Sequence, residues 1–486
     1  MSGFKRKAIS GFFWQAFGLV GQQGIQLIAN LLFARLLLRE ENGVVIAAIA
    51  ILDYATLLRV SGILQAFVAY EGDDTETRHT VFWACLASGV AMSAALFFGA
   101  PLIASWLNSD GLTPVLRALS VMQLIDSIRI VPFALIWRHL RFKERTIAET
   151  VPFIAGLVAA VVGLAVLPRE QRVYAVVWMY LVRSVGQALL FLYFEPYHPT
   201  AKFDWSFFRL ISRRSVGVLA FNLPSSTLVS LPSIAVFGRA GEAAGGAFGL
   251  AAKLTAPATS LSYAANITLF PIFAQLKNDA EKLKASILRS LKGAAVLPIA
   301  LLTFIIATAP ELIPVVLGEK WRSAVPAARW IALAGIFQMY SFVLASVLLA
   351  ASKTIYIIIT WTSTLVLAAA LLFFVPMVRG EALVGGQITA AYGAFGFVMS
   401  LGATSIAMRI PIGSILSTLV PASLSAVAAV AASLVAGAAV QHEAARLAIK
   451  TLAFGVVLLP ACGILLGGSW RSLLTPKGLR ELIGRN

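Results

Sequence analysis

Charged side chains interrupt several long apolar stretches of this chain, and these residues are the first candidates for chemistry. A charge at the centre of a bilayer costs about 3 kcal/mol or more, so an ionisable residue inside a membrane span is a functional candidate by default. The set comprises Asp53, Arg59, Asp126, Arg129, Arg183 and Lys253. Its cations outnumber its acids, and a cationic cavity suits an anionic group, above all a phosphate, which Arg binds through two parallel hydrogen bonds.

Spacing in the sequence shows which of these charges have a possible partner on the same helix. Asp126 and Arg129 are three residues apart, on one helix face, where they either neutralise each other or serve the cavity. Asp53 and Arg59 lie about 120° apart on a helical wheel, so each needs a partner on another helix. Arg183 and Lys253 have no acid nearby in sequence, whereas Arg117 and Arg329 fall near span ends, where their side chains can reach the interface.

A row of amides marks the first apolar stretch. Gln15, Gln22, Gln26 and Asn30 fall within about 80° of one another on a helical wheel. Amides facing lipid would have no hydrogen-bond partners, so this face meets water or another helix. Two interpretations stay open for Gln22 and Gln26, namely bonds between helices or the lining of a substrate cavity.

The composition fixes the class of protein that must position these residues. The chain is 59% hydrophobic and only 13% charged, whereas soluble proteins carry about 25% charged residues. Runs of about 20 apolar residues, the length needed to cross a bilayer, account for most of the sequence. We predict an all-α polytopic membrane protein of about fourteen spans, with twelve as the main rival count.

The distribution of basic residues predicts the orientation. The net charge of +17 reflects Lys and Arg gathered in alternate loops, so nucleic acid is not an expected partner. This bias puts both termini in the cytoplasm. The longest inner link separates the chain into predicted parts: an N-terminal lobe (1–194), a linker on the membrane surface (195–211), a C-terminal lobe (212–407), two extra helices (408–470) and a basic tail (471–486).

Motifs for catalysis or for cofactor binding are missing from the sequence. There is no Gly-rich phosphate loop, the four histidines lack metal-ligand spacing, and the two cysteines, Cys85 and Cys462, are isolated in apolar runs. We therefore expect a protein that is not an enzyme, with no metal site. Asp53 and Asp126 are the expected binders of a coupling H⁺ or Na⁺, the one cofactor that the residues suggest.

A short turn occurs twice and suggests two homologous halves. The stretch 33–43 (FARLLLREENG) ends one apolar run and begins the next, and 237–245 (FGRAGEAAG) repeats the pattern about two hundred residues later. In both copies an aromatic residue and an Arg are followed by an acid and a Gly. Internal repeats around a central cavity are a common plan of transporters.

These elements, in their order, resemble a known family. The following residues of this chain carry the resemblance: Trp14 with the turn at 33–43, Gly62-Ile63, Pro132 with the basic run 138–143, Gly238-Arg239 with Gly245, Phe270-Pro271, and the stretch Gly318-Glu319-Lys320-Trp321. Over roughly residues 1–350 the chain is similar to polysaccharide flippases, the oligosaccharide-lipid (Wzx-type) branch of the multidrug/oligosaccharidyl-lipid/polysaccharide exporter superfamily.

The resemblance implies a fold and a substrate. The fold would be two pseudo-symmetric six-helix lobes in a V plus two C-terminal helices. The substrate would be an undecaprenyl-pyrophosphate-linked oligosaccharide, flipped outward across the bacterial inner membrane by a monomer that serves a polysaccharide polymerase and export machinery. The cavity would use Arg59, Arg129, Arg183 and Lys253 for the anionic head group. From the residues themselves, we expect the Gln22 and Gln26 face to hydrogen-bond sugar hydroxyls.

Other functions remain in view from the sequence. The first span lacks the early Ser-Arg motif typical of the peptidoglycan-precursor flippase, which argues against lipid II as the substrate. A cation-coupled multidrug exporter of the same superfamily would favour an aromatic, acid-lined cavity. A polytopic glycosyl polymerase or ligase would need a large extracytoplasmic loop, which the predicted spans do not leave room for.

Overall fold

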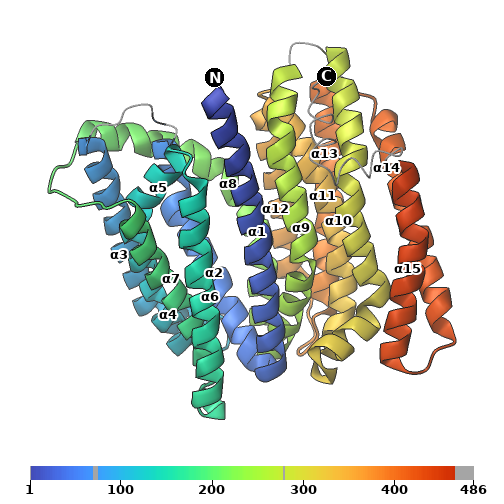
Figure 1. Cartoon of the computed structure of the whole chain (residues 1–486). Helices are drawn as coiled ribbons and strands as arrows, with labels where there is room; N and C mark the ends of the chain where they lie inside the picture. The colour runs from blue at the N-terminus through green and yellow to red at the C-terminus, as the bar shows by residue number, and fades with distance from the viewer. Residues whose placement is uncertain (1, 69, 71–74, 277–279, 466–486) are drawn as a thin grey trace. The chain divides into compact units, whose positions relative to one another are not determined.

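The computed structural model describes residues 2–68, 70, 75–276 and 280–465, and within these ranges it contains helices and no strand (Figure 1). This confirms the predicted all-α membrane fold. The helices are α1 (Ser2–Leu36), α2 (Arg39–Val68), α3 (Thr75–Trp106), α4 (Leu112–Ile128), α5 (Ile130–Arg138), α6 (Phe142–Val166), α7 (Val173–Phe194), α8 (Trp205–Ala240), α9 (Glu242–Leu276), α10 (Ala280–Leu317), α11 (Val325–Ala350), α12 (Thr354–Phe374), α13 (Leu383–Met408), α14 (Ile412–Ala438) and α15 (Glu443–Leu465), with short 3₁₀ turns η1 (Arg169–Gln171) and η2 (Glu319–Ala324).

The described residues do not confirm the expected count of fourteen membrane spans. Among the described residues, 10 helices are long and apolar enough to cross a membrane, or up to 12 if each of two bent pairs is one span. The bent pairs are α4 with α5, and the two parts of α8. The long helices α1 and α9 fall outside both groups, so the count of fourteen is not confirmed.

Packing divides the chain into two compact units. Unit 1 comprises Met1–Gly249, which includes α1 to α8 and the first turns of α9, and unit 2 comprises Leu250–Asn486. One apolar cluster of unit 1 joins α2, α3 and α4 around Leu52, Leu96 and Leu116. In unit 2, Tyr340 and Leu344 of α11 pack with residues of α10, α13 and α14. The predicted division into lobes at residues 195–211 stays a prediction.

Prolines account for both bent helix pairs. Pro132 has no backbone N–H to donate to the carbonyl of Ile128, and α4 and α5 meet there at 48° with Arg129 at the junction. Pro224 likewise cannot bond the carbonyl of Ala220, where α8 bends by 51°.

The linker between α7 and α8 is attached to the start of α3. His79 hydrogen-bonds the hydroxyl of Tyr197 at 2.7 Å, and burial raises the pKa of Tyr197 to about 12, so the phenol keeps its proton. Asp204 caps α8: hydrogen bonds from the Ser206 side chain and from the backbone N–H of Phe207 hold the pKa of Asp204 below its usual range. These bonds fix residues 195–204 as an ordered connection.

The two copies of the repeated turn lie against each other. The chain breaks between α1 and α2, and again at Gly241, where φ is 96°, between α8 and α9. A Cβ atom on Gly43 would lie 2.0 Å from the carbonyl oxygen of Glu242, and one on Gly246 would lie 2.3 Å from the carbonyl oxygen of Arg39. The starts of α2 and α9 therefore cross backbone to backbone, which requires glycine at both positions.

We expect Gly43→Ala to destabilise the protein, because the added methyl must displace the backbone of α9 rather than a flexible side chain. The thermal midpoint in detergent, followed by tryptophan fluorescence, should fall by several degrees, as overpacking costs about 1–3 kcal/mol. Gly99→Ala is the matched control, since nothing lies within 4 Å of a Cβ there. A midpoint for Gly43→Ala equal to that of Gly99→Ala would contradict the close crossing.

Candidate functional site

Arg59 is buried in unit 1 and held by neutral acceptors. Its Nε donates to Gln123 Oε1 at 3.0 Å and its Nη1 donates to Ser127 Oγ at 2.7 Å. Arg59 is only 5% exposed. Gln123 is itself fixed, because its amide donates to the carbonyl of Leu52 and to the hydroxyl of Thr56. Among the described residues Arg59 forms no ion pair, so its charge is solvated by an amide and a hydroxyl of α4.

A glycine makes this arrangement fit. A Cβ atom on Gly89 of α3 would lie 1.9 Å from Ser127 Oγ, the oxygen that accepts from Arg59. The same oxygen donates to the carbonyl of Gln123 at 2.7 Å. Any larger residue at position 89 would therefore displace the acceptor of a buried cation.

Asp126 and Arg129 form an ion pair at the junction of α4 and α5. Arg129 Nε lies 2.9 Å from Asp126 Oδ1, and both side chains are largely buried. The hydroxyl of Ser184 on α7 donates to the same carboxylate oxygen at 3.0 Å, and the Arg129 guanidinium lies 5.7 Å from the centre of the Phe191 ring. The spacing in sequence predicted this pairing as one of two alternatives, and it neutralises both charges.

Arg183 contacts an aromatic ring rather than an acid. Its guanidinium carbon lies 4.3 Å from the centre of the buried Phe153 ring, an arrangement in which the ring face attracts the cation. The residue is half-buried on α7. Within the part of the chain that the structure describes, Arg183 has no carboxylate partner.

The amide row of α1 meets α6. Gln26 donates to Asn30 Oδ1 at 3.1 Å along the same helix, and Gln22 donates to Glu149 Oε2 at 3.2 Å across to α6. The side chain of Gln15 lies outside the described residues. The row thus makes bonds between helices at one point, and the structure leaves its second interpretation, a cavity lining, untested.

Glu149 and Arg145 were missing from the expected site. Arg145 Nε lies 2.9 Å from Glu149 Oε1, and the Arg145 guanidinium lies 5.1 Å from the ring centres of both Phe133 and Trp137. The i, i+4 spacing of a cation and an acid in the first turns of a helix was the available signal. Arg145 was counted among the basic residues of a cytoplasmic loop, so the pair was not considered.

The remaining two expected residues lie on α2 and α9. Asp53 is exposed on α2, and Lys253 is half-buried on α9 in unit 2. Within unit 1 the structure brings together Arg59, Asp126 and Arg129 around α4, with Arg183 on the neighbouring α7. In the described part of the chain, no group of three or more His, Cys, Asp or Glu side chains could hold a metal ion.

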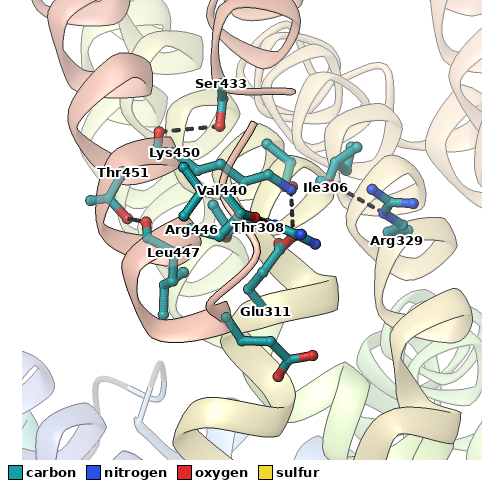
Figure 2. A network of polar contacts seen from close by, with 12 residues as sticks. Ile306, Thr308, Glu311, Arg329, Ser433, Val440, Arg446, Leu447, Lys450 and Thr451 are labelled. Atoms are coloured by element: carbon teal, nitrogen blue, oxygen red, sulfur yellow. Dashed lines mark hydrogen bonds and ion pairs between the residues drawn. The ribbon is translucent and has the colours of Figure 1, made fainter. Parts of the chain in front are cut away.

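Unit 2 contains a buried ion pair that the sequence did not predict. Lys450 Nζ of α15 lies 2.7 Å from Glu311 Oε1 of α10, and the residues are 5% and 3% exposed (Figure 2). Arg446 approaches the same oxygen at 3.9 Å, while Glu311 Oε2 is buried and accepts no hydrogen bond. The ion pair thus joins the C-terminal hairpin of α14 and α15 to α10.

A second glycine admits the lysine stem. A Cβ atom on Gly437 of α14 would lie 2.6 Å from Lys450 Cε, and Ser433 of α14 donates to the carbonyl of Lys450 at 3.1 Å. Figure 2 shows Lys450 reaching past Ser433 toward Glu311. A larger residue at position 437 would have to displace the Lys450 side chain.

The fold and its buried charges define a class, a helical membrane protein with cations inside its spans. The profile of a family described as "Polysaccharide biosynthesis protein" matches residues 32–326, which is more than half of the chain. The chain belongs to this family, in agreement with the resemblance seen in its motifs.

Individual relatives agree with this assignment, and a solved structure shares the fold. The chain is 24% identical over 352 residues to the lipopolysaccharide biosynthesis protein WzxC of Escherichia coli, covering 72% of this chain and 71% of the relative. It is 25% identical over 325 residues to the succinoglycan biosynthesis transport protein ExoT of Rhizobium meliloti, covering 66% and 64%. The structure of the lipid II flippase MurJ in an inward closed conformation matches with a TM-score of 0.71 at 13% identity, covering 96% of this chain and 99% of that one. At this identity the match establishes the fold alone.

We expect loss of one partner of the Glu311–Lys450 pair to destabilise the protein far more than loss of both. Glu311→Gln leaves a buried cation without its counter-charge, and such changes cost about 3–5 kcal/mol. The double variant Glu311→Leu with Lys450→Met should be close to the original in stability, because no buried charge is left. Thermal unfolding in detergent measures both.

The exposed pair of Arg322 and Glu443 provides the control for that experiment. Its atoms lie 2.7 Å apart with side chains 50% and 40% exposed, so Arg322→Gln should change stability little. If the double variant were as unstable as Glu311→Gln, the loss of stability would not come from an unpaired buried charge.

Proposed function

We propose that this protein flips an undecaprenyl-pyrophosphate-linked oligosaccharide from the cytoplasmic to the outer leaflet of the bacterial inner membrane, by alternating access. The product would feed assembly of an exopolysaccharide, a capsule or an O-antigen. Membership of the polysaccharide biosynthesis family supports the class of cargo. The relatives named for lipopolysaccharide biosynthesis and for succinoglycan transport support it further.

The observation that carries the proposal is the state of the cations in unit 1. Arg129 is neutralised by Asp126, whereas Arg183 and Arg59 have no carboxylate partner among the described residues. Arg183 is half-buried and stacked on Phe153, so its remaining N–H groups can turn to an anionic ligand. A pyrophosphate supplies the acceptor oxygens that a guanidinium binds best.

The amide row supplies the complementary chemistry for the sugars. Gln22 and Gln26 each carry donors and an acceptor, as sugar hydroxyls do, so they suit a ligand that presents both. In this proposal the polyprenyl tail stays in lipid, and Lys253 is a further candidate for binding the anionic head group. Asp53, which is exposed, or Asp126 would bind a coupling H⁺ or Na⁺.

We expect Arg183→Ala to reduce translocation about tenfold or more, because a hydrogen bond to a charged group contributes about 1.5–3 kcal/mol. Translocation is measured in a strain lacking the wild-type gene, as the fraction of lipid-linked repeat units that reaches the outer leaflet. Units that accumulate on the cytoplasmic leaflet support a flippase, whereas unpolymerised units on the outer leaflet indicate a polymerase.

Arg117→Ala is the matched control. Arg117 also stacks on a phenylalanine, with its guanidinium 5.3 Å from the Phe97 ring centre, but it lies near a span end. It should translocate like the wild type at equal expression. Equal translocation by Arg183→Ala and Arg117→Ala would remove Arg183 from the site.

The proposed orientation predicts that the linker of residues 195–204 faces the cytoplasm. A cysteine introduced at the exposed Ala201, in a variant whose Cys85 and Cys462 are replaced, should react with a membrane-impermeant maleimide only after the cells are opened. Labelling of this cysteine in intact spheroplasts would show that the linker faces the outside and that the proposed orientation is reversed.

A further inference from the structure

Helix α1 is joined to α6 at successive points along its length. About a third of the way along α1, the Thr146 hydroxyl donates to the carbonyl of Trp14 at 3.1 Å. One turn further on, a Cβ atom at Gly18 would lie 2.8 Å from Thr146 Cγ2, so the helices nearly touch. One more turn on, Gln22 bonds Glu149 at 3.2 Å. This last contact differs from the others because it holds a side chain of the amide row.

Glu149 is well placed to hold that side chain. One carboxylate oxygen accepts from Arg145 and the other from Gln22, while the Glu149 side chain is 22% exposed. Arg145 cannot swing away easily, since its guanidinium lies against the rings of both Phe133 and Trp137. The Gln187 amide on α7 reaches the backbone carbonyl of Glu149 at 3.4 Å, which fixes the helix at this turn.

The held carboxylate determines the orientation of Gln22. An amide can present either its oxygen or its NH₂ group in a given direction. Because Glu149 accepts a hydrogen bond from the NH₂ group of Gln22, the amide oxygen and the second N–H of Gln22 point away from Glu149. The remaining groups are then fixed in place before a ligand arrives, which reduces the entropy lost on binding.

We propose that Glu149 is a positioning residue, whose carboxylate orients Gln22 for the hydroxyl groups of the sugar. The proposal rests on the function proposed above, in which Gln22 contacts the substrate. Glu149 itself contacts Gln22 and Arg145, and acts on the sugar through Gln22. Arg145 and its two aromatic rings form the support that keeps the carboxylate in position.

The test is a double-mutant cycle on translocation kinetics in proteoliposomes that contain lipid-linked oligosaccharide. Glu149→Ala should raise the apparent KM about tenfold, the loss of roughly one hydrogen bond, with kcat little changed. Glu149→Gln, whose amide can still bond Gln22 and Arg145, should recover most of the affinity. In a Gln22→Ala background, Glu149→Ala should have no further effect on KM. Equal KM factors in the two backgrounds would overturn the proposal.

A structural readout separates this inference from the proposed function. Spin labels at the exposed positions Leu27 and Val151 report the separation of α1 and α6 in the empty protein. Glu149→Ala and Gln22→Ala should each broaden that distance distribution. If Glu149→Ala does not fold, Gln22→Ala still tests the contact, because it leaves the ion pair of Glu149 with Arg145 intact. An unchanged distribution in Gln22→Ala would show that Glu149 does not hold α1.

Glu144→Gln is the matched control, since Glu144 is a carboxylate on the same helix that pairs with Arg141 and not with α1. It should alter neither the KM nor the distance distribution. If the wild type moves no lipid-linked oligosaccharide while the distances respond to Glu149, the proposed function fails and the contact between α1 and α6 stands.

Discussion

A charge inside a membrane-spanning helix must find partners within the protein, and this requirement shapes both units of the structure. Three different partners occur in unit 1. Arg59 is bound by an amide and a hydroxyl, Arg129 by a carboxylate, and Arg183 by the face of a ring. In unit 2 the partner of Lys450 is again a carboxylate. Glycines at positions 89 and 437 follow from these bonds, because each leaves the space that a charged group or its acceptor occupies.

These solutions differ in what they leave for a ligand. An ion pair such as Asp126 with Arg129 cancels its own field, so it contributes structure more than attraction. An amide, a hydroxyl or an aromatic ring stabilises a cation without cancelling its charge. Arg59 and Arg183 therefore keep a positive potential in the interior of unit 1, and an arginine held this way remains able to attract an anion. In the proposed function, this distinction separates the charges that support the fold from those that would bind a substrate.

Sequence patterns predicted what depends on neighbours along the chain. Apolar runs identified the helices, the spacing of three residues predicted the Asp126–Arg129 pair as an alternative, and the repeated turn predicted two helix breaks. The partners of Arg183 and Gln22 could not be predicted in this way, because Phe153 and Glu149 lie on another helix. Glu311 and Lys450 are 139 residues apart, so no local spacing indicated their pairing. The exact number of spans also stayed open, since α1 carries an amide row and α8 is bent.

The crossing of α2 and α9 at Gly43 and Gly246 has a consequence for the order in which the protein is made. Helix α2 leaves the ribosome some two hundred residues before its crossing partner, and chains generally fold from the N-terminus during synthesis. Gly43 at the start of α2 therefore lacks its contact with α9 until residues 242–249 have been synthesised. Unit 1 reaches its final packing only when the first turns of α9 have been inserted, well after the linker at 195–204 has been completed.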